Sequence, residues 1–150
     1  MAKVGRASRN ASLVRMETIT ADKTILPAES GEVYLLNAAA STITLPALKE
    51  GYYTRIVVGT TLENNASLIR IVSPSGKMEG GAFTQIIAGA SGFVRATVAS
   101  DLVFKVTSSA ASGNGVYAGS TIDIYCDGAR WHVHAQIYSK GTTTTAFAAS

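Results

Sequence analysis

The chain has 150 residues, of which 47% are apolar and only 15% are charged, and its net charge is +3. One domain of this length buries roughly 70% of its unfolded surface without a metal or a disulfide, and the single cysteine, Cys126, excludes an internal disulfide and a cysteine-based zinc cage. Because no apolar run reaches roughly 18 residues and the N-terminus lacks a signal-peptide core, we expect synthesis in a cytoplasm and no membrane partner.

Small and basic residues without periodicity fill the segment 1–16, which predicts a flexible arm. All of the positive excess lies there, because the chain from Glu17 onward carries nine basic and ten acidic residues. Such an arm can contact an acidic protein surface or nucleic acid, or remain a solvated tail. No aromatic residues are interleaved with basic ones, so we expect no direct nucleic-acid contact. The basic residues of the arm are Lys3, Arg6, Arg9 and Arg15.

Apolar and polar residues alternate from Glu17 to Ser139, and Gly, Pro or Asn interrupts the alternation every ten or so residues. This spacing predicts nine or ten short strands, no helix and no fixed-period repeat. The clearest local signal is Asp127-Gly128, which tolerates the positive φ angles of a tight hairpin turn, with Ala129 as a further candidate turn residue. The expected strands span 17–26, 33–36, 42–45, 53–58, 68–72, 83–88, 93–98, 102–106, 120–126 and 130–139.

We therefore predict an all-β fold, a single antiparallel β-sandwich or jelly-roll-like domain over residues 17–139. The tail, residues 140–150, is rich in threonine and is expected to be either a frayed end or a strand that pairs with a neighbouring subunit. The low charge fits a face buried between subunits, and we expect an oligomer or assembly subunit. The alternative is a monomer whose Thr, Ser and Ala surface stays soluble through its hydroxyl groups.

The two histidines, His132 and His134, lie two positions apart on one expected strand, so they point to the same face. They could share a metal ion with Asp123 or Asp127 across the hairpin. We favour surface or interface histidines instead, because Trp131 and its alternate neighbours form the apolar face of that strand. No metal and no cofactor are therefore expected.

Catalytic motifs are missing from the sequence. The segment 112–119 fails the spacing of a glycine-rich phosphate loop and opens no helix. The segment 89–92 misses the nucleophile-elbow pattern, and the acidic residues are scattered singly. We expect no enzymatic activity.

Aromatic residues could form a platform that stacks on carbohydrate, and we single out Tyr52, Tyr53 and Trp131 as contact residues. The full set of candidates is Tyr52, Tyr53, Tyr117, Tyr125, Trp131 and Tyr138. Adjacent strand residues face opposite ways, so only one of Tyr52 and Tyr53 can join a given platform. Core packing is the more usual role of strand aromatics.

Several short motifs carry a family resemblance: Ser30-Gly31 before a hydrophobic strand, Thr42-Ile-Thr-Leu-Pro46, Gly51 before the next strand, and Asp127-Gly128-x-x-Trp131. Through them the chain resembles small structural proteins of tailed bacteriophages, in particular head decoration (capsid cement) proteins, and also related modules of tail fibres. The resemblance covers most of residues 18–138.

The resemblance implies a β-sandwich or jelly-roll subunit, commonly a homotrimer, that binds the major capsid protein on the capsid surface and stabilises the head. The basic arm would then be the capsid anchor. The alternative implied function is a tail-fibre or receptor-binding module that recognises host surface glycans through Tyr52, Tyr53 or Trp131.

Overall fold

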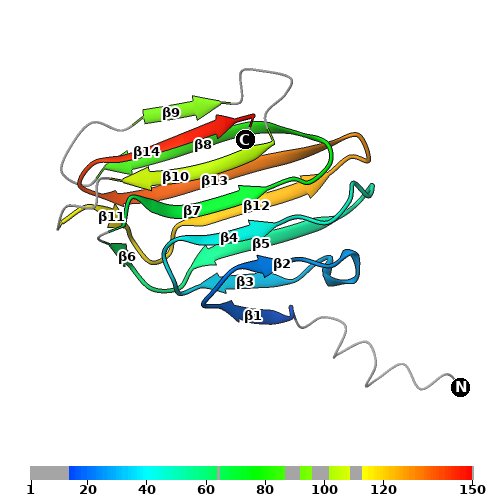
Figure 1. The fold of residues 1–150 in the computed structure, drawn as a ribbon, viewed down its shortest axis with the longest axis horizontal. Helices are drawn as coiled ribbons and strands as arrows, with labels where there is room; N and C mark the ends of the chain where they lie inside the picture. Colours follow the sequence, from blue (N-terminus) through cyan, green and yellow to red (C-terminus); the bar gives the residue numbers. More distant parts are fainter. Residues whose placement is uncertain (1–13, 64, 87–91, 96–101, 109–112, 150) are drawn as a thin grey trace, which may run out of the picture.

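Two β-sheets pack face to face in the computed structural model, which describes residues 14–63, 65–86, 92–95, 102–108 and 113–149 (Figure 1). One 3-10 turn, η1 (Pro27–Glu29), is the sole helical element among these residues. The expectation of an all-β, sandwich-like single domain is confirmed. Nothing helical in the described chain is long and apolar enough to span a bilayer.

The larger sheet has the order β1-β3-β5-β12-β13, with β8 along the other edge of β13 and β9 beyond β8. A short antiparallel pair, β6 and β11, extends the sheet beyond the ends of β5 and β12. Strand β11 pairs with the last residues of β13, on the same side as β12, and β6 pairs with β11. The strands are β1 (Met16–Ile19), β3 (Val33–Leu36), β5 (Tyr53–Val58), β6 (Leu62–Glu63), β8 (Lys77–Ile86), β9 (Gly92–Arg95), β11 (Gly115–Val116), β12 (Thr121–Cys126) and β13 (Arg130–Lys140).

The smaller sheet has five strands in the order β14-β10-β7-β4-β2. Its strands β7 and β10 are antiparallel neighbours with one register shift, between Val106 and Thr107. The strands are β2 (Lys23–Thr24), β4 (Ser41–Thr44), β7 (Ser67–Val72), β10 (Val103–Ser108) and β14 (Thr143–Ala148).

Successive N-terminal strands alternate between the two sheets, which the sequence did not predict. We call each passage of the chain through both sheets a winding. Strands β1, β3 and β5 lie side by side in the larger sheet, while β2, β4 and β7 lie side by side in the smaller one. Each return to a sheet is in the same direction, so these neighbours are parallel. The predicted antiparallel arrangement therefore needs correction: both sheets are mixed. Met16 pairs with Val33 and Val33 with Arg55, and because these two steps along the chain are unequal, no fixed-period repeat is visible.

The predicted hairpin joins β12 to β13, and Cys126 pairs with Trp131 at its closed end. The Asp127 carboxylate accepts hydrogen bonds from the backbone N–H groups of Ala129 and Arg130, at 2.8 and 2.7 Å. Gly128 has φ +93°, which an L side chain adopts only with strain. Both the hairpin and the place of Ala129 in its turn are confirmed.

The C-terminal segment is a strand of the sandwich. Strand β14 pairs antiparallel with β10 of the same chain, from Ser108 opposite Thr143 to Val103 opposite Ala148. This corrects the separate tail at residues 140–150, since neither a frayed end nor a strand on a neighbouring subunit describes it. At the other end β1 begins at Met16, within the segment that we assigned to the arm, and residues 1–13 lie outside the described residues.

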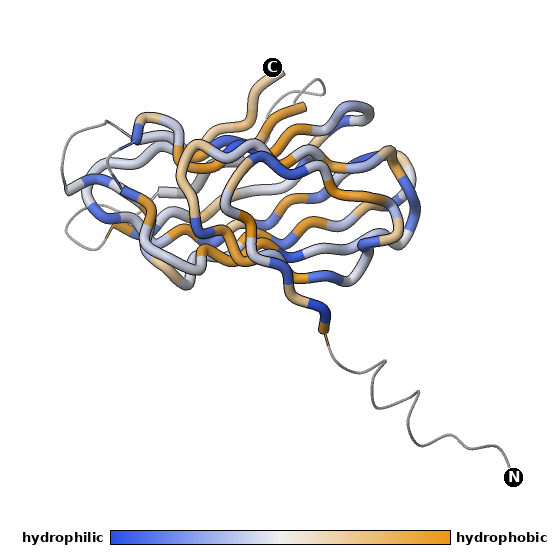
Figure 2. Tube along the Cα trace, turned by 60° about the horizontal axis from the view of Figure 1, so that its bottom comes forward, coloured by the Kyte–Doolittle hydropathy of each residue, from blue (hydrophilic) through white to orange (hydrophobic). Residues whose placement is uncertain are grey.

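The core lies between the two sheets, and hydropathy alternates along the strands that enclose it (Figure 2). Trp131 of β13 and Tyr52, just before β5, are both fully buried and meet edge to face, with ring centroids 5.5 Å apart. Burying a large apolar side chain contributes roughly 1.5–3 kcal/mol. This contact joins the N-terminal windings to the C-terminal hairpin in one core.

Candidate binding surface on the larger sheet

The outer face of the larger sheet carries a group of side chains that the core does not use. Alternation along each strand turns every second residue outward, and the pairing of β5, β12, β13 and β8 brings these residues into register. We call this group the central patch. It consists of Tyr53, Arg55, Phe83, Asp123, Tyr125, His132 and His134.

Three nearly parallel rings form one row of the central patch. The Tyr125 ring stacks with His132 at 4.8 Å between centroids and an interplanar angle of 14°, and with His134 at 5.7 Å and 8°. The Tyr125 hydroxyl and His134 Nε2 lie 3.3 Å apart. Tyr125 is 41% exposed, so the row presents an aromatic surface to solvent.

A hydrogen-bonded carboxylate forms the next row. Asp123 accepts bonds from Arg55 Nε and Nη2, at 2.6 and 2.9 Å, and from the Tyr53 hydroxyl at 2.7 Å. Burial opposes ionisation of Asp123, but the bonds from Arg55 and Tyr53 outweigh it and lower the pKa of the carboxyl group. A carboxylate with a lowered pKa and three donors is a poor general base, so this row is suited to binding rather than to proton transfer.

An open depression of about 260 Å³ lies beside these rows. Gly81 stands opposite His134 in the register and has no side chain to fill the space. Phe83, 41% exposed, forms another part of the wall. The depression offers an aromatic ring, an imidazole, a carboxylate and the Gln136 amide, which can contact one face of a small polar group such as a sugar ring.

The two histidines do not share a ligand site. His132 Nε2 lies 2.9 Å from Asp127 Oδ2, whereas His134 contacts Tyr125. In the described part of the chain, the one group of three His, Cys, Asp or Glu side chains whose ligand atoms converge lies elsewhere. The geometry favours surface histidines at this hairpin over a shared metal ion.

Of the three aromatic residues proposed for a contact surface, only Tyr53 is exposed, at 38%. Tyr52 and Trp131 are corrected: both are buried, at 1% and 0% exposure, and pack against each other in the core. Tyr125, another candidate for the platform, is exposed, at 41%. Alternation places its side chain outward, but its partners depend on the strand pairing, which the sequence did not show.

The basic residues of the arm are only partly placed. Lys3, Arg6 and Arg9 lie outside the described residues. Arg15 Nη1 lies 2.9 Å from Glu32 Oε1, although the Arg15 side chain is 81% exposed. Its charge is therefore engaged within the chain itself.

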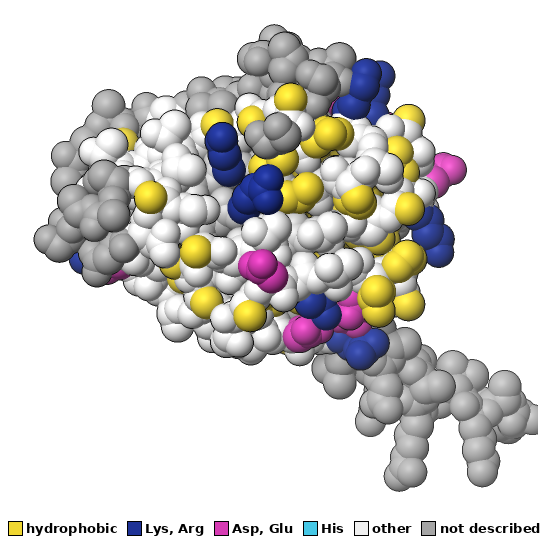
Figure 3. Space-filling model, in the orientation of Figure 1, with side chains coloured by type: hydrophobic (Ala, Val, Ile, Leu, Met, Phe, Trp, Pro, Cys, Tyr) yellow, Lys and Arg dark blue, Asp and Glu magenta, His cyan; other side chains and the backbone are white. Residues whose placement is uncertain are grey.

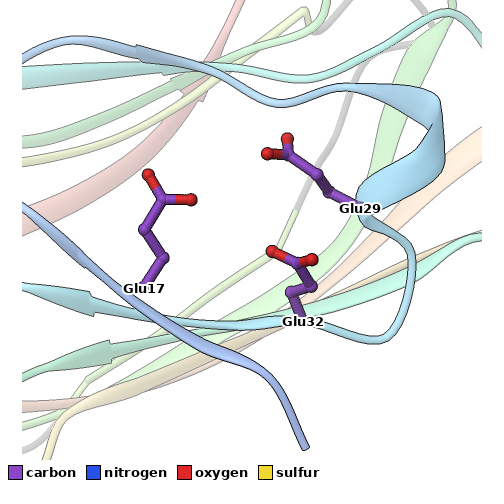
Figure 4. A group of neighbouring side chains, drawn as sticks. All are labelled: Glu17, Glu29 and Glu32. Carbon is purple, nitrogen blue, oxygen red and sulfur yellow. The ribbon is translucent and has the colours of Figure 1, made fainter.

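The converging acidic side chains are Glu17, Glu29 and Glu32, which we call the carboxylate cluster (Figure 4). The Lys23 ammonium group donates to both carboxylate oxygens of Glu17 and to Glu29 Oε1, each at 3.0 Å. The sequence alone does not reveal this cluster, because irregular and short-strand structure separates its members along the chain.

Comparisons of the chain with protein-family models, curated proteins and solved structures found no match.

Proposed function

We propose that this chain is a structural protein of a tailed-bacteriophage virion, a head decoration protein that binds the major capsid protein as an oligomer and stabilises the capsid. The resemblance supplies the capsid partner. The all-β sandwich and a surface with little charge are compatible with a subunit that adheres to identical copies and to a larger shell.

The observation that carries the self-association is the edge strand β14. It runs Thr-Thr-Thr-Ala-Phe-Ala over Thr143–Ala148, with no charge and no proline. One of its edges pairs with β10, and among the described residues no strand pairs with the other edge. Natural proteins usually protect such an edge with charges, bulges or proline, because it is a template for pairing with another chain.

The outer face of the smaller sheet supports the same proposal. Figure 3 views the molecule from this side and shows mostly uncharged side chains, with few basic and acidic groups among them. Arg70 of β7 and Lys105 of β10 are direct cross-strand neighbours there. A broad face with so few charges loses little hydration when another subunit covers it. Several weak contacts of this kind, linked through one oligomer, would act together at high effective concentration.

The test combines sizing with capsid binding. The purified protein is expected to elute with a mass of three times 15.6 kDa and to fill sites on capsids that lack it. Thr144→Lys adds a charge on the exposed edge strand β14 and is expected to shift the oligomer toward single subunits. Gln136→Lys, at an exposed position of the interior strand β13, is the matched control and should leave the oligomer intact. Failure of the wild-type protein to bind capsids would overturn the proposal.

A second candidate function is a receptor-binding module that recognises host glycans, favoured by the central patch and its depression. Stacking of sugar rings on aromatic side chains requires exposed rings, which Tyr125 and Phe83 provide. Tyr125→Ala is expected to abolish binding to host cells or a glycan array while leaving the far-UV spectrum unchanged. Binding that persists in this variant would remove the central patch from consideration.

A further inference from the structure

The carboxylate cluster brings three acids together at the first winding of the chain. Glu17 lies on β1, Glu29 ends η1, and Glu32 directly precedes β3. One ligand oxygen from each lies within 4.8 Å of the others, and all three carboxylates point into a common space (Figure 4). Like charges this close require cations, and Lys23 and Arg15 supply two.

Buried polar atoms with incomplete hydrogen bonding border the same space. Tyr34 and Tyr52 are 0% and 1% exposed; the Tyr34 hydroxyl lies beside the Glu29 carboxylate and interacts with it, whereas the Tyr52 hydroxyl has no hydrogen-bond partner among the described residues. Burial raises the pKa of both phenols, in the case of Tyr52 to about 12, and the next largest cause for both is the nearby Glu29 charge. Glu32 is 5% exposed, and its Oε1 lies 2.9 Å from Arg15 Nη1 as one side of an ion pair.

Such atoms are rare in folded proteins and usually mark a site for water or an ion. Four buried side-chain atoms in the described residues lack a well-formed hydrogen bond, and three of them, Glu32 Oε1 and the hydroxyl oxygens of Tyr34 and Tyr52, belong to this group. The fourth, Trp131 Nε1, belongs to a ring that packs on Tyr52. The unsatisfied polar groups thus gather around the carboxylates rather than being spread through the core.

Charge balance favours a divalent cation. With Lys23 and Arg15 in place, the three carboxylates leave a net charge of −1. The Lys23 side chain is 21% exposed and can swing into solvent, which would leave a net charge of −2 for an incoming ion to neutralise. A depression of about 190 Å³, lined by residues 17–23, gives solvent access beside Glu17 and Lys23.

We propose that Glu17, Glu29 and Glu32 bind a calcium ion, which takes the place of the Lys23 ammonium group. Oxygen ligands of one Ca²⁺ lie about 2.3–2.6 Å from the ion, so oxygens within 4.8 Å of one another fit around it with small side-chain rotations. Mg²⁺ demands a tighter octahedron at about 2.0–2.1 Å, which three carboxylates from separate segments match less well. This site does not depend on the proposed capsid function.

The first experiment measures thermal unfolding and calorimetric binding of the full chain after treatment with EDTA. At a Ca²⁺ concentration about 100 times the Kd, the Tm is expected to rise by roughly 5–10 °C. Mg²⁺ and NaCl at equal ionic strength should give a smaller shift. The absence of both a Ca²⁺-dependent Tm shift and binding heat in the wild-type protein would overturn the proposal and leave water as the occupant.

Two variants separate a bound ion from a general salt effect. Glu17→Gln removes the most exposed ligand and should weaken Ca²⁺ binding at least tenfold. Its matched control is Glu63→Gln, which neutralises a carboxylate paired with Lys140 at 2.8 Å outside the cluster and should leave the Ca²⁺ shift unchanged. Equal Ca²⁺ shifts in both variants would contradict the site.

Lys23→Met removes the competing ammonium group. The variant is expected to have a lower Tm than wild type in EDTA and to bind Ca²⁺ at least tenfold more tightly. A purely structural role of Lys23 would lower the Tm without increasing the response to Ca²⁺, and that outcome would count against the exchange of one cation for the other.

Discussion

The N-terminal and C-terminal parts of the sandwich build the same two layers in different ways. In the coil half, residues 14–63 and 65–72, neighbouring strands are parallel and the chain visits the other sheet between them. In the hairpin half, residues 102–108 and 113–148, β12 and β13 are antiparallel and joined by a short turn, while β14 returns along β10. Alternation of apolar and polar residues is common to both halves. It reports which side chains are buried, but not which strand lies alongside.

The two halves also differ in what they bury. The hairpin half contributes apolar side chains such as Ile122, Ile124 and Val133. Both halves also bury hydroxyl groups, such as that of Ser139 in the hairpin half. Among the described residues, however, the one buried carboxylate is Glu32, in the coil half. Where the N-terminal strands are parallel, the loops that connect them lie beside one another. Side-chain interactions, rather than short hairpin turns, hold these loops in place.

The largest expected effect comes from the contact that joins the halves. Trp131→Ala should reduce the free energy of unfolding by about 3–5 kcal/mol, because it leaves a cavity beside Tyr52. Trp131→Phe keeps an aromatic ring and leaves a smaller cavity, so it should cost less than Trp131→Ala. Urea unfolding followed by circular dichroism measures both. Two separate transitions in Trp131→Ala would show that the halves unfold independently, contrary to a single core.

A smaller loss is expected where β8 and β13 approach each other. Gly80 has φ +125°, and a Cβ atom there would overlap the carbonyl oxygen of Val133. Gly80→Ala should therefore cost roughly 2–4 kcal/mol in urea unfolding. Gly92→Ala on the edge strand β9 is the control: a Cβ there meets nothing within 4 Å, and the change should stay within about 0.5 kcal/mol. Equal stabilities of the two variants would contradict the close packing of this parallel pair.

In the coil half, the Asp22 side chain links two consecutive windings of the chain. The Thr42 backbone N–H donates to Asp22 Oδ1 at 2.7 Å, although the two residues lie far apart in the sequence. Asp22→Ala should lose about 0.5–1.5 kcal/mol in urea unfolding, the net worth of such a bond at an exposed site. Asp22→Asn keeps an acceptor oxygen at the same place and should lose less. A variant Asp22→Ala as stable as wild type would show that the windings do not need this link.

The smallest effect concerns the turn of the hairpin half and is visible as a titration. His132, together with the N–H groups of Ala129 and Arg130, lowers the pKa of Asp127 to about 2. Because the folded pKa lies below the unfolded value of about 3.9, the stabilisation is present above about pH 3.9 and is lost as the pH falls toward 2. Carbon-13 NMR of the carboxyl group measures this pKa. His132→Gln should raise it, and an Asp127 that already titrates near its unfolded value in the wild type would contradict the turn geometry.

Sequence reasoning was most successful where structure is local. The Asp-Gly turn at 127–128 needs only neighbouring residues to form, and the opposite orientations of Tyr52 and Tyr53 follow from strand geometry alone. Parallel pairing is different. The sequence of a strand does not show whether the strand pairs with the next strand of a hairpin or with a strand of the next winding, much further along the chain.

The candidate sites were missed for the same reason. The central patch depends on β5, β12 and β13 lying in register, and the carboxylate cluster depends on Glu29 of η1 lying close to Glu17 of β1. Charge gave no local signal either, because Glu17, Glu29 and Glu32 stand singly in the sequence. The uncharged C-terminal segment was misassigned because its partner, β10, lies far earlier in the chain, before the whole β12–β13 hairpin.

The winding of the coil half has a consequence for how the protein can change in length. Each winding contacts chiefly the one before and the one after it, and the loops between paired strands already differ in length. A whole winding inserted or deleted near β1 would leave the hairpin untouched and merely lengthen or shorten the slab. The length of the sandwich could therefore change while the β12–β13 hairpin stays the same.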